Sequence, residues 1–343
     1  IVGSAGALDS SLDKATSGAH GFVSGCANTG NVSVDTPQTN GIDRFGNVVY
    51  SQGSNVGGIA GYSRASIDSC YNSGYLSANH TTGVAGIVGS LRAKTTTSSY
   101  HGNFSQEGSD DGMTEGAASL SITNCGNSGN VWGYAFPAGI AGRTGTNTSI
   151  EGCLNDSGTY VLGTRSTKPF PSGIVGSSYG TVAYCANLGT VAAGTWEDES
   201  LKTIKTSGGY FASGIAGNIS YFTKAEDGAQ TRVSPLPEVY GCYNAGTVLA
   251  IDNMRQRALV GDNSGYVHDN VAEKGKVYDD RLVYGMYSVD TVSSGGTVSN
   301  NVLVSNGELK NNTSIETSQG SSSTVVAEGA TVLSILNSAG DKG

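Results

Sequence analysis

The sequence predicts an all-β chain folded as a parallel, right-handed β-helix, a solenoid of about eight coils with loop insertions. Three observations lead to this prediction. Two short motifs alternate along most of the chain, and the shortest units between them have the length of one solenoid turn. The 52 glycines are about twice the average share of roughly 7%. The hydrophobic residues are mostly small or β-branched, as a narrow β core requires.

All six cysteines lie in one motif, Cys-x-Asn-x-Gly or a near variant of it. They are Cys26, Cys70, Cys125, Cys153, Cys185 and Cys242. Because asparagine and glycine tolerate positive φ, we expect the Asn-x-Gly step to form the tight corner of each turn.

A second motif, Gly-Ile-(Ala/Val)-Gly, precedes the cysteine motif. It begins at Gly58, Gly86, Gly139, Gly173 and Gly214, and Ile1-Val2-Gly3 matches it without the first glycine, so we expect the chain to begin within a repeat. The distance from Gly58 to Cys70 is 12 residues. An apolar residue, such as Val32 or Leu76, follows each cysteine motif. We therefore expect three short strands in each repeat.

Two degenerate repeats follow the sixth cysteine. In them, Asn270 and Asn301 occupy the position of the cysteine. Fading terminal repeats are typical of the end of a solenoid. We therefore assign residues 1–305 to the β-helix and residues 306–343 to a C-terminal tail that caps its open end.

Equivalent residues of successive coils should stack about 4.8 Å apart and form ladders. Secreted proteins usually pair their cysteines, but thiols stacked in register on parallel strands match disulfide geometry poorly. We therefore expect free, buried thiols that act as small apolar fillers. The chain has no Cys-x-x-Cys pair or histidine partner for these thiols, so we expect no metal site and no cofactor.

Aromatic residues suggest a second ladder. Phe136, Phe170 and Phe211 each stand before a Gly-Ile motif and should stack, either as a core or corner stack or as a surface platform for sugar rings. Trp132 and Tyr134 alternate with Phe136, so the three could share one face. Trp132 and Tyr134 are therefore our candidate ligand-binding residues.

The composition and motifs disfavour several functions. The net charge of −9 argues against nucleic acid or an anionic membrane as a partner, and no apolar stretch is long enough for membrane insertion. We find no catalytic motif and expect no enzymatic activity. Four carboxylates in different repeats could still meet on one face, as in a β-helix polysaccharide lyase or glycoside hydrolase. They are Asp68, Glu151, Asp269 and Asp279.

The paired motifs resemble the GLUG-type repeats of bacterial surface proteins, from Ile1 to about Val304. The resemblance implies an extracellular, cell-surface setting and no catalytic residues. We therefore expect a non-catalytic segment of an adhesin-like protein, a rigid stalk whose partner is a host or bacterial surface glycan or protein. The long insertions at 91–118 and 219–238 depart from the repeat pattern, and we expect them to display binding loops.

Overall fold

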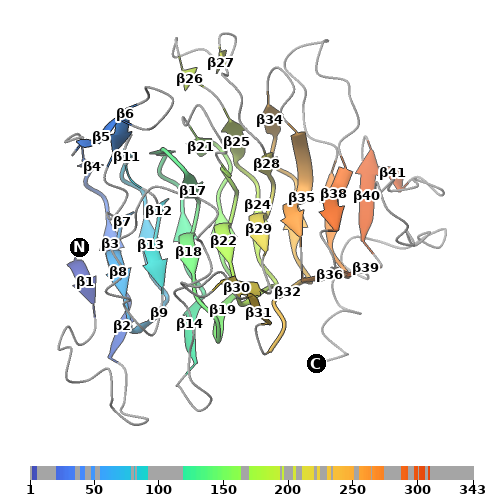
Figure 1. The fold of residues 1–343 in the computed structure, drawn as a ribbon, viewed down its shortest axis with the longest axis horizontal. Coiled ribbons are helices and arrows are strands. Elements are labelled where there is room, and N and C mark those ends of the chain that lie inside the picture. Colours follow the sequence, from blue (N-terminus) through green and yellow to red (C-terminus); the bar gives the residue numbers. More distant parts are fainter. Residues whose placement is uncertain are drawn as a thin grey trace.

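A computed structural model describes part of the chain. The described residues are 2–5, 21–34, 39–42, 48–50, 55–78, 81, 83–91, 119–163, 170–193, 195–196, 204–205, 211–219, 222–224, 230–232, 235–250, 255–263, 265–273, 287–292, 297–299, 301–305 and 308–309. Over these ranges the structure is strand, turn and loop without helix, so the all-β prediction is confirmed. The strands lie side by side in sequence order along the long axis (Figure 1).

Parallel sheets built from equivalent strands of successive repeats make up the fold. The strands that follow the Gly-Ile corner form sheet A, which comprises β1 (Val2–Ala5), β8 (Ala60–Ser63), β13 (Val88–Leu91), β18 (Ala141–Thr144), β22 (Val175–Ser178), β29 (Ala216–Ile219), β35 (Arg255–Asn263) and β38 (Tyr287–Val292). The strands that lead into the cysteine position form sheet B, which comprises β2 (Phe22–Ser24), β9 (Ser66–Asp68), β14 (Leu120–Thr123), β19 (Thr148–Glu151), β23 (Thr181–Ala183), β32 (Glu238–Tyr240), β36 (Tyr266–His268) and β39 (Thr297–Ser299).

Two further sheets complete the outer wall. The strands that carry the asparagine of the cysteine motif form sheet C, which comprises β3 (Ala27–Asn28), β10 (Tyr71–Asn72), β15 (Gly126–Asn127), β20 (Leu154–Asn155), β24 (Ala186–Asn187), β33 (Tyr243–Asn244), β37 (Val271–Glu273), β40 (Val302–Ser305) and the antiparallel β41 (Glu308–Leu309). The strands after the motif glycine form sheet D, which comprises β4 (Val32–Ser33), β11 (Leu76–Ala78), β16 (Val131–Gly133), β21 (Tyr160–Gly163), β25 (Thr190–Ala193) and β34 (Val248–Ala250).

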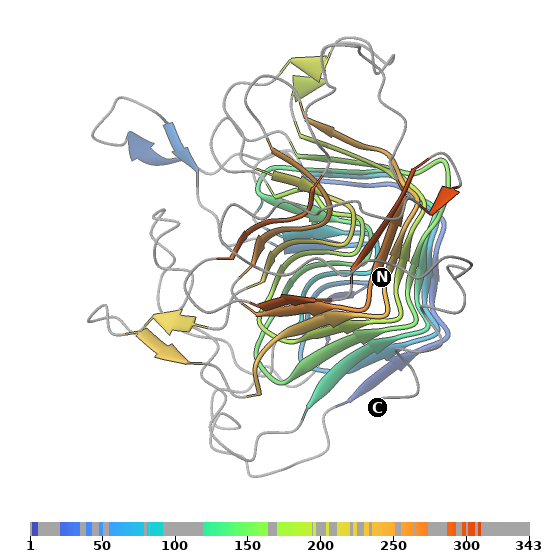
Figure 2. The same cartoon turned by 90° about the vertical axis from the view of Figure 1, so that its right-hand side faces the viewer.

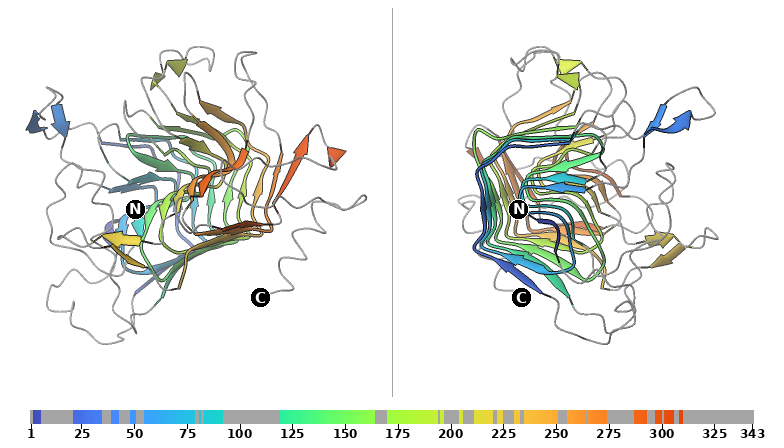
Figure 3. Two further views of the ribbon diagram at one scale, coloured as in Figure 1. Left: turned by 45° about the vertical axis from the view of Figure 1, so that its right-hand side comes forward. Right: turned by 90° about the vertical axis from the view of Figure 1, so that its left-hand side faces the viewer.

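A short strand before the Gly-Ile corner was not expected. It occurs as β7 (Asn55–Gly57), β12 (Gly83–Ala85), β17 (Phe136–Ala138) and β28 (Phe211–Ser213), which we call the inner strands. A repeat therefore contains up to five strands, and the expectation of three is wrong. Seen along the stack, equivalent segments of successive repeats lie over one another as nested layers (Figures 2 and 3). This arrangement is consistent with a parallel β-helix.

The insertions contain short antiparallel hairpins where the structure describes them. These are β5 (Thr39–Ile42) with β6 (Val48–Tyr50), β26 (Thr195–Trp196) with β27 (Ile204–Lys205), and β30 (Phe222–Lys224) with β31 (Gln230–Arg232). The last of these hairpins lies in the insertion at 219–238. Residues 92–118 of the other long insertion lie outside the described residues.

The interior contains two main apolar clusters. Sheets A and B enclose the first, which includes the motif isoleucines Ile59, Ile87, Ile140, Ile174 and Ile215, all at most 2% exposed. Sheet D and the inner strands enclose the second, which includes Leu76, Val84 and Val131. The strands before and after the Gly-Ile corner therefore contribute to different clusters: the inner strand packs into the second cluster and the following strand of sheet A packs into the first.

A backbone corner with positive φ lies one residue before each cysteine and before Asn270. The residues there adopt positive φ, and they are Gly25, Ser69, Asn124, Gly152, Tyr184, Gly241 and Asp269. The asparagines of the motif are instead strand residues of sheet C. The chain does bend at the following glycine, but of these glycines only Gly158 has positive φ, in the motif with one inserted residue. The expected corner at Asn-x-Gly is therefore present, but the positive φ expected there is absent from the five regular motifs.

The glycines of the two motifs are required for close approach between backbones. A Cβ added to Gly129 would lie 2.0 Å from the carbonyl oxygen of Gly74 in the preceding repeat. A Cβ added to Gly86 would lie 2.3 Å from the carbonyl oxygen of Gly139 and 2.4 Å from the Cγ of Asn127. The Gly-Ile corner therefore packs against the asparagine of its own repeat, which explains why the two motifs occur together.

Candidate functional site

The six cysteines lie in one internal ladder, and all six are free thiols. Cys26, in the first repeat, is exposed and the other five are buried. Burial raises the pKa of Cys70 to about 11 and that of Cys185 well above its ordinary value. Cys70 and Cys185 are therefore protonated and weak nucleophiles at neutral pH.

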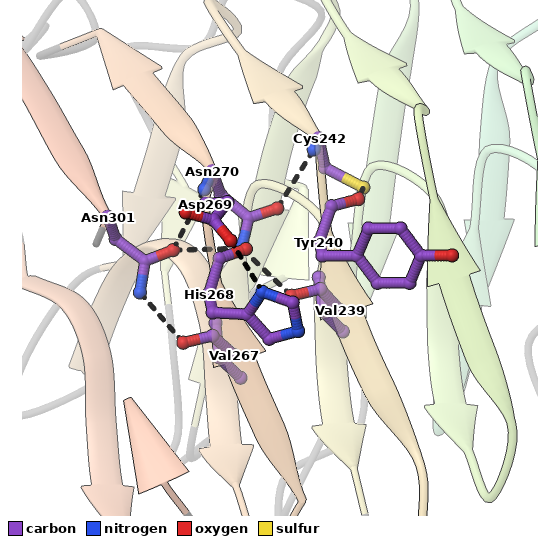
Figure 4. Close-up of polar contacts among 8 residues, drawn as sticks. All are labelled: Val239, Tyr240, Cys242, Val267, His268, Asp269, Asn270 and Asn301. Carbon is purple, nitrogen blue, oxygen red and sulfur yellow. Dashed lines mark hydrogen bonds and ion pairs between the residues drawn. The ribbon is translucent and has the colours of Figure 1, made fainter. Parts of the chain in front are cut away.

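Each buried thiol donates to the backbone of its own and the preceding repeat. The Sγ of Cys242 lies 3.4 Å from the carbonyl oxygen of Tyr240 and 3.7 Å from that of Val182. At the same position one repeat later, the amide Nδ2 of Asn270 donates to the equivalent carbonyls of His268 and Val239, at 2.8 and 2.9 Å (Figure 4). Asparagine thus replaces the thiol because it makes the same pair of contacts.

A second internal ladder, which the sequence did not predict, consists of the motif asparagines. The side-chain Nδ2 of each donates to the Oδ1 of the next at 2.7–2.9 Å, through Asn28, Asn72, Asn127, Asn155, Asn187 and Asn244. The ladder ends at Asn244, whose Nδ2 has no partner among the described residues because Ala272 follows it. In the repeat that contains Ala272, Ala258 also stands in place of the glycine that packs against the asparagine in earlier repeats. The joint loss of this glycine and this asparagine is the sequence signal that could have revealed their contact.

The predicted aromatic ladder is an internal stack where the structure describes it. The rings of Phe136 and Phe170 are parallel, with centroids 5.5 Å apart, and both side chains are buried. The strand register places Phe211 next in the same line, but its side chain lies outside the described residues.

The two candidate ligand-binding residues do not share one face. Trp132 faces outward from sheet D and packs with Leu162, Ala192 and Leu249, whereas Tyr134 packs with the phenylalanine stack. The expected alternation fails because β16 ends at Gly133 and the chain bends at the next two residues.

Another surface gathers aromatic and polar side chains, at the corner between sheets B and C. We call it the aromatic corner and define it by Tyr184, Tyr240, His268 and Asp269. The register brings these residues together from three neighbouring repeats, because Ala183 pairs with Tyr240 and Tyr240 with His268. Tyr184 and Asp269 each follow one of these strand positions, at the positive-φ corner.

The rings of the aromatic corner contact one another from each repeat to the next along the axis of the solenoid. Tyr184 meets Tyr240 edge to face, with centroids 5.3 Å apart and an interplanar angle of 87°. The ring of Tyr240 is parallel to that of His268, with centroids 5.3 Å apart and an interplanar angle of 5° (Figure 4). The Nδ1 of His268 lies 2.9 Å from the Oδ2 of Asp269, which fixes the orientation of the imidazole. All four residues remain accessible to solvent, and Tyr184 is 41% exposed.

Negative charge surrounds the aromatic corner. Partial burial, together with the nearby carboxylates of Glu151 and Glu238, raises the pKa of Tyr240. Farther along the same surface, hydrogen bonds from Thr123, Ser69 and Asn124 lower the pKa of the Asp68 carboxyl. The surface is therefore acidic and also rich in hydrogen-bonding groups.

The carboxylates considered for catalysis lie on separate repeats where the structure describes them. Asp68 and Glu151 occupy one line of sheet B two repeats apart, about 10 Å at the usual strand spacing. Asp269 lies three repeats beyond Glu151, about 14 Å along the stack. A retaining glycosidase needs its two carboxyl groups about 5–5.5 Å apart, which neither of these separations provides, and an inverting one needs about 6.5–9.5 Å, close to the separation of Asp68 and Glu151. Asp279 lies outside the described residues.

Comparison of the chain with protein-family models, curated proteins and solved structures gave no match. Within the described ranges, no group of three or more histidine, cysteine or acidic side chains is placed to hold a metal ion. Within the same ranges, no helix is long and apolar enough to cross a membrane.

Proposed function

We propose that this chain is a non-catalytic stalk segment of a bacterial cell-surface, adhesin-like protein of the GLUG-repeat type. It folds as a right-handed β-helix of about eight coils and holds a binding surface away from the cell. The partner is a host or bacterial surface glycan or protein.

One observation carries this proposal. The cysteines and asparagines of the repeated motif build ladders that are buried except at Cys26, whereas the outward positions beside the cysteine ladder differ from repeat to repeat. The line of sheet B that points away from the core contains Asp68, Thr123, Glu151, Ala183, Tyr240 and His268 in successive repeats, and all of these except Ala183 are accessible to solvent. A scaffold that keeps its interior constant and varies one surface is suited to binding.

The test is a paired measurement of binding and turnover. The whole chain is screened on an array of host and bacterial surface glycans and on intact cells, and each polysaccharide is also assayed for new reducing ends or unsaturated products. We expect binding without turnover. Turnover of any polysaccharide would contradict the proposal, and so would the absence of binding to all glycans and cells.

A further inference from the structure

We infer that the aromatic corner binds a linear, uncharged glycan whose chain runs along the axis of the stack. This inference rests on the proposed binding function and names the ligand class of the site. It assigns contacts with sugar rings to Tyr184, Tyr240 and His268, and contacts with hydroxyl groups to His268 and Asp269.

The rings provide the apolar half of the site. Pyranose rings present axial C–H groups, which carry a small positive charge and pack against the negative faces of aromatic rings. The ring of Tyr184 lies against the backbone of the next repeat, because a Cβ on Gly241 would lie 2.6 Å from its Cδ1. Tyr184 is therefore pre-positioned despite its exposure, so little conformational entropy is lost when a ligand binds.

The polar half comes from the His268–Asp269 pair. Within the described residues, Asp269 is the hydrogen-bonding partner of the His268 ring, through Nδ1. The second ring nitrogen, Nε2, lies beside the ring of Tyr240, and the side chains of His268 and Asp269 are 30% and 15% exposed. Both act as partners for sugar hydroxyl groups, which donate and accept hydrogen bonds.

The spacing of the repeats favours an extended chain over a single sugar. Neighbouring strands lie about 4.8 Å apart, close to the length of one sugar residue in an extended glycan. The three aromatic side chains stand on three successive repeats and can contact successive sugar residues.

Charge selects among glycans. Glu151 pairs with Ala183, the residue before Tyr184, and Glu238 stands two residues before Tyr240 in β32. Asp269 contacts the His268 ring, and the whole chain carries a net charge of −9. A uronate, sulfated or sialylated chain would be repelled by these carboxylates. An uncharged chain avoids this repulsion.

The test uses calorimetric titration of the whole chain with neutral cello-, manno- and chito-oligosaccharides of six residues. Oligogalacturonate is the anionic comparison and oligolysine the cationic one. We expect at least one neutral chain to bind and oligogalacturonate not to bind. Tyr184→Ala should weaken the neutral ligand by roughly five- to tenfold.

Tyr71→Ala is the matched control, because Tyr71 is similarly exposed, at 43%, and its ring also lies over a glycine of the next repeat, Gly126. We expect less than a twofold change for this variant. Failure of every neutral chain to bind, or equal effects of the two substitutions, would overturn the inference. If oligolysine binds and Tyr184→Ala abolishes that binding, the inference of a glycan ligand is overturned but the proposed binding function is not. Turnover of a glycan would overturn the proposed function itself.

Discussion

Removal of one asparagine from the middle of the amide ladder should destabilise the chain about twice as much as removal of the asparagine at its end. Asn127 is fully buried, and its side chain makes four hydrogen bonds. Two of these bonds join it to Asn72 and Asn155, and two join it to the backbone of Gly129. Asn244 accepts two, from the Nδ2 of Asn187 and the N–H of Gly246, and its own Nδ2 has no partner among the described residues.

At about 1 kcal/mol net for each buried hydrogen bond, Asn127→Ala should cost about 4 kcal/mol and Asn244→Ala about 2 kcal/mol. The two substitutions remove the same atoms from the same position of the repeat, and they differ in the bonds that the Nδ2 of Asn127 makes and that of Asn244 does not. Urea unfolding followed by circular dichroism measures both, and the slopes must be compared because repeat arrays can unfold in parts. Equal losses of stability would refute the contribution assigned to the hydrogen bonds of the ladder.

Three further predictions concern the thiols and the acidic surface. Cys26 should react with a thiol reagent at pH 8 in the folded chain while the five buried cysteines stay protected, and Cys26→Ser should abolish this reaction; rapid labelling of several thiols would contradict the burial described above. Cys242→Asn should change the free energy of unfolding by less than about 1 kcal/mol, because asparagine makes the same backbone contacts at Asn270. Cys242→Val, which has no donor for these contacts, should cost about 1–2 kcal/mol in thermal unfolding. The reverse order would show that the contacts are not equivalent. Thr123→Val should raise the pKa of Asp68 in a carboxyl NMR titration, because the first of its hydrogen bonds is lost. The lowered pKa of Asp68 stabilises the fold above the ordinary pKa of a carboxyl group, and this contribution is lost as the pH falls towards the pKa of the folded state. The variant should therefore lose less stability on acidification than the original chain. An unchanged pKa would argue against the contact.

The repeat itself could be predicted from the sequence. Isoleucine and cysteine recur at fixed positions, and the structure places both in stacked internal lines because a parallel register aligns equivalent residues. Val2 also pairs with Ala60, as expected if Ile1-Val2-Gly3 is a Gly-Ile motif without its first glycine.

The corners and the amide ladder could not be predicted from the same motifs. Positive φ falls on a residue whose identity varies, from Gly25 to Ser69 and Tyr184, so no single residue type marks it. Asn-x-Gly is a common turn signal, and that local preference concealed the role of the asparagine in stacking.

The aromatic corner was missed for a different reason. Tyr240 and His268 stand two residues before the cysteine position, and Tyr184 stands one residue before it, in repeats separated by insertions. Their proximity follows from the register of sheet B and not from sequence distance. Trp132 and Tyr134, which are close in sequence, proved to pack in different places.

In-register stacking of the repeats underlies every inference above, and a single distance tests it. Thr29 and Ala245 follow the ladder residues Asn28 and Asn244, which are five pairing steps apart in sheet C. Five steps at the strand spacing give roughly 24 Å, although 216 residues separate the two positions. Spin labels on Thr29→Cys and Ala245→Cys, introduced together with Cys26→Ser, should give a narrow distance distribution centred near that value in pulsed electron paramagnetic resonance. A broad distribution, or one centred beyond roughly 35 Å, would contradict the stacking of the repeats.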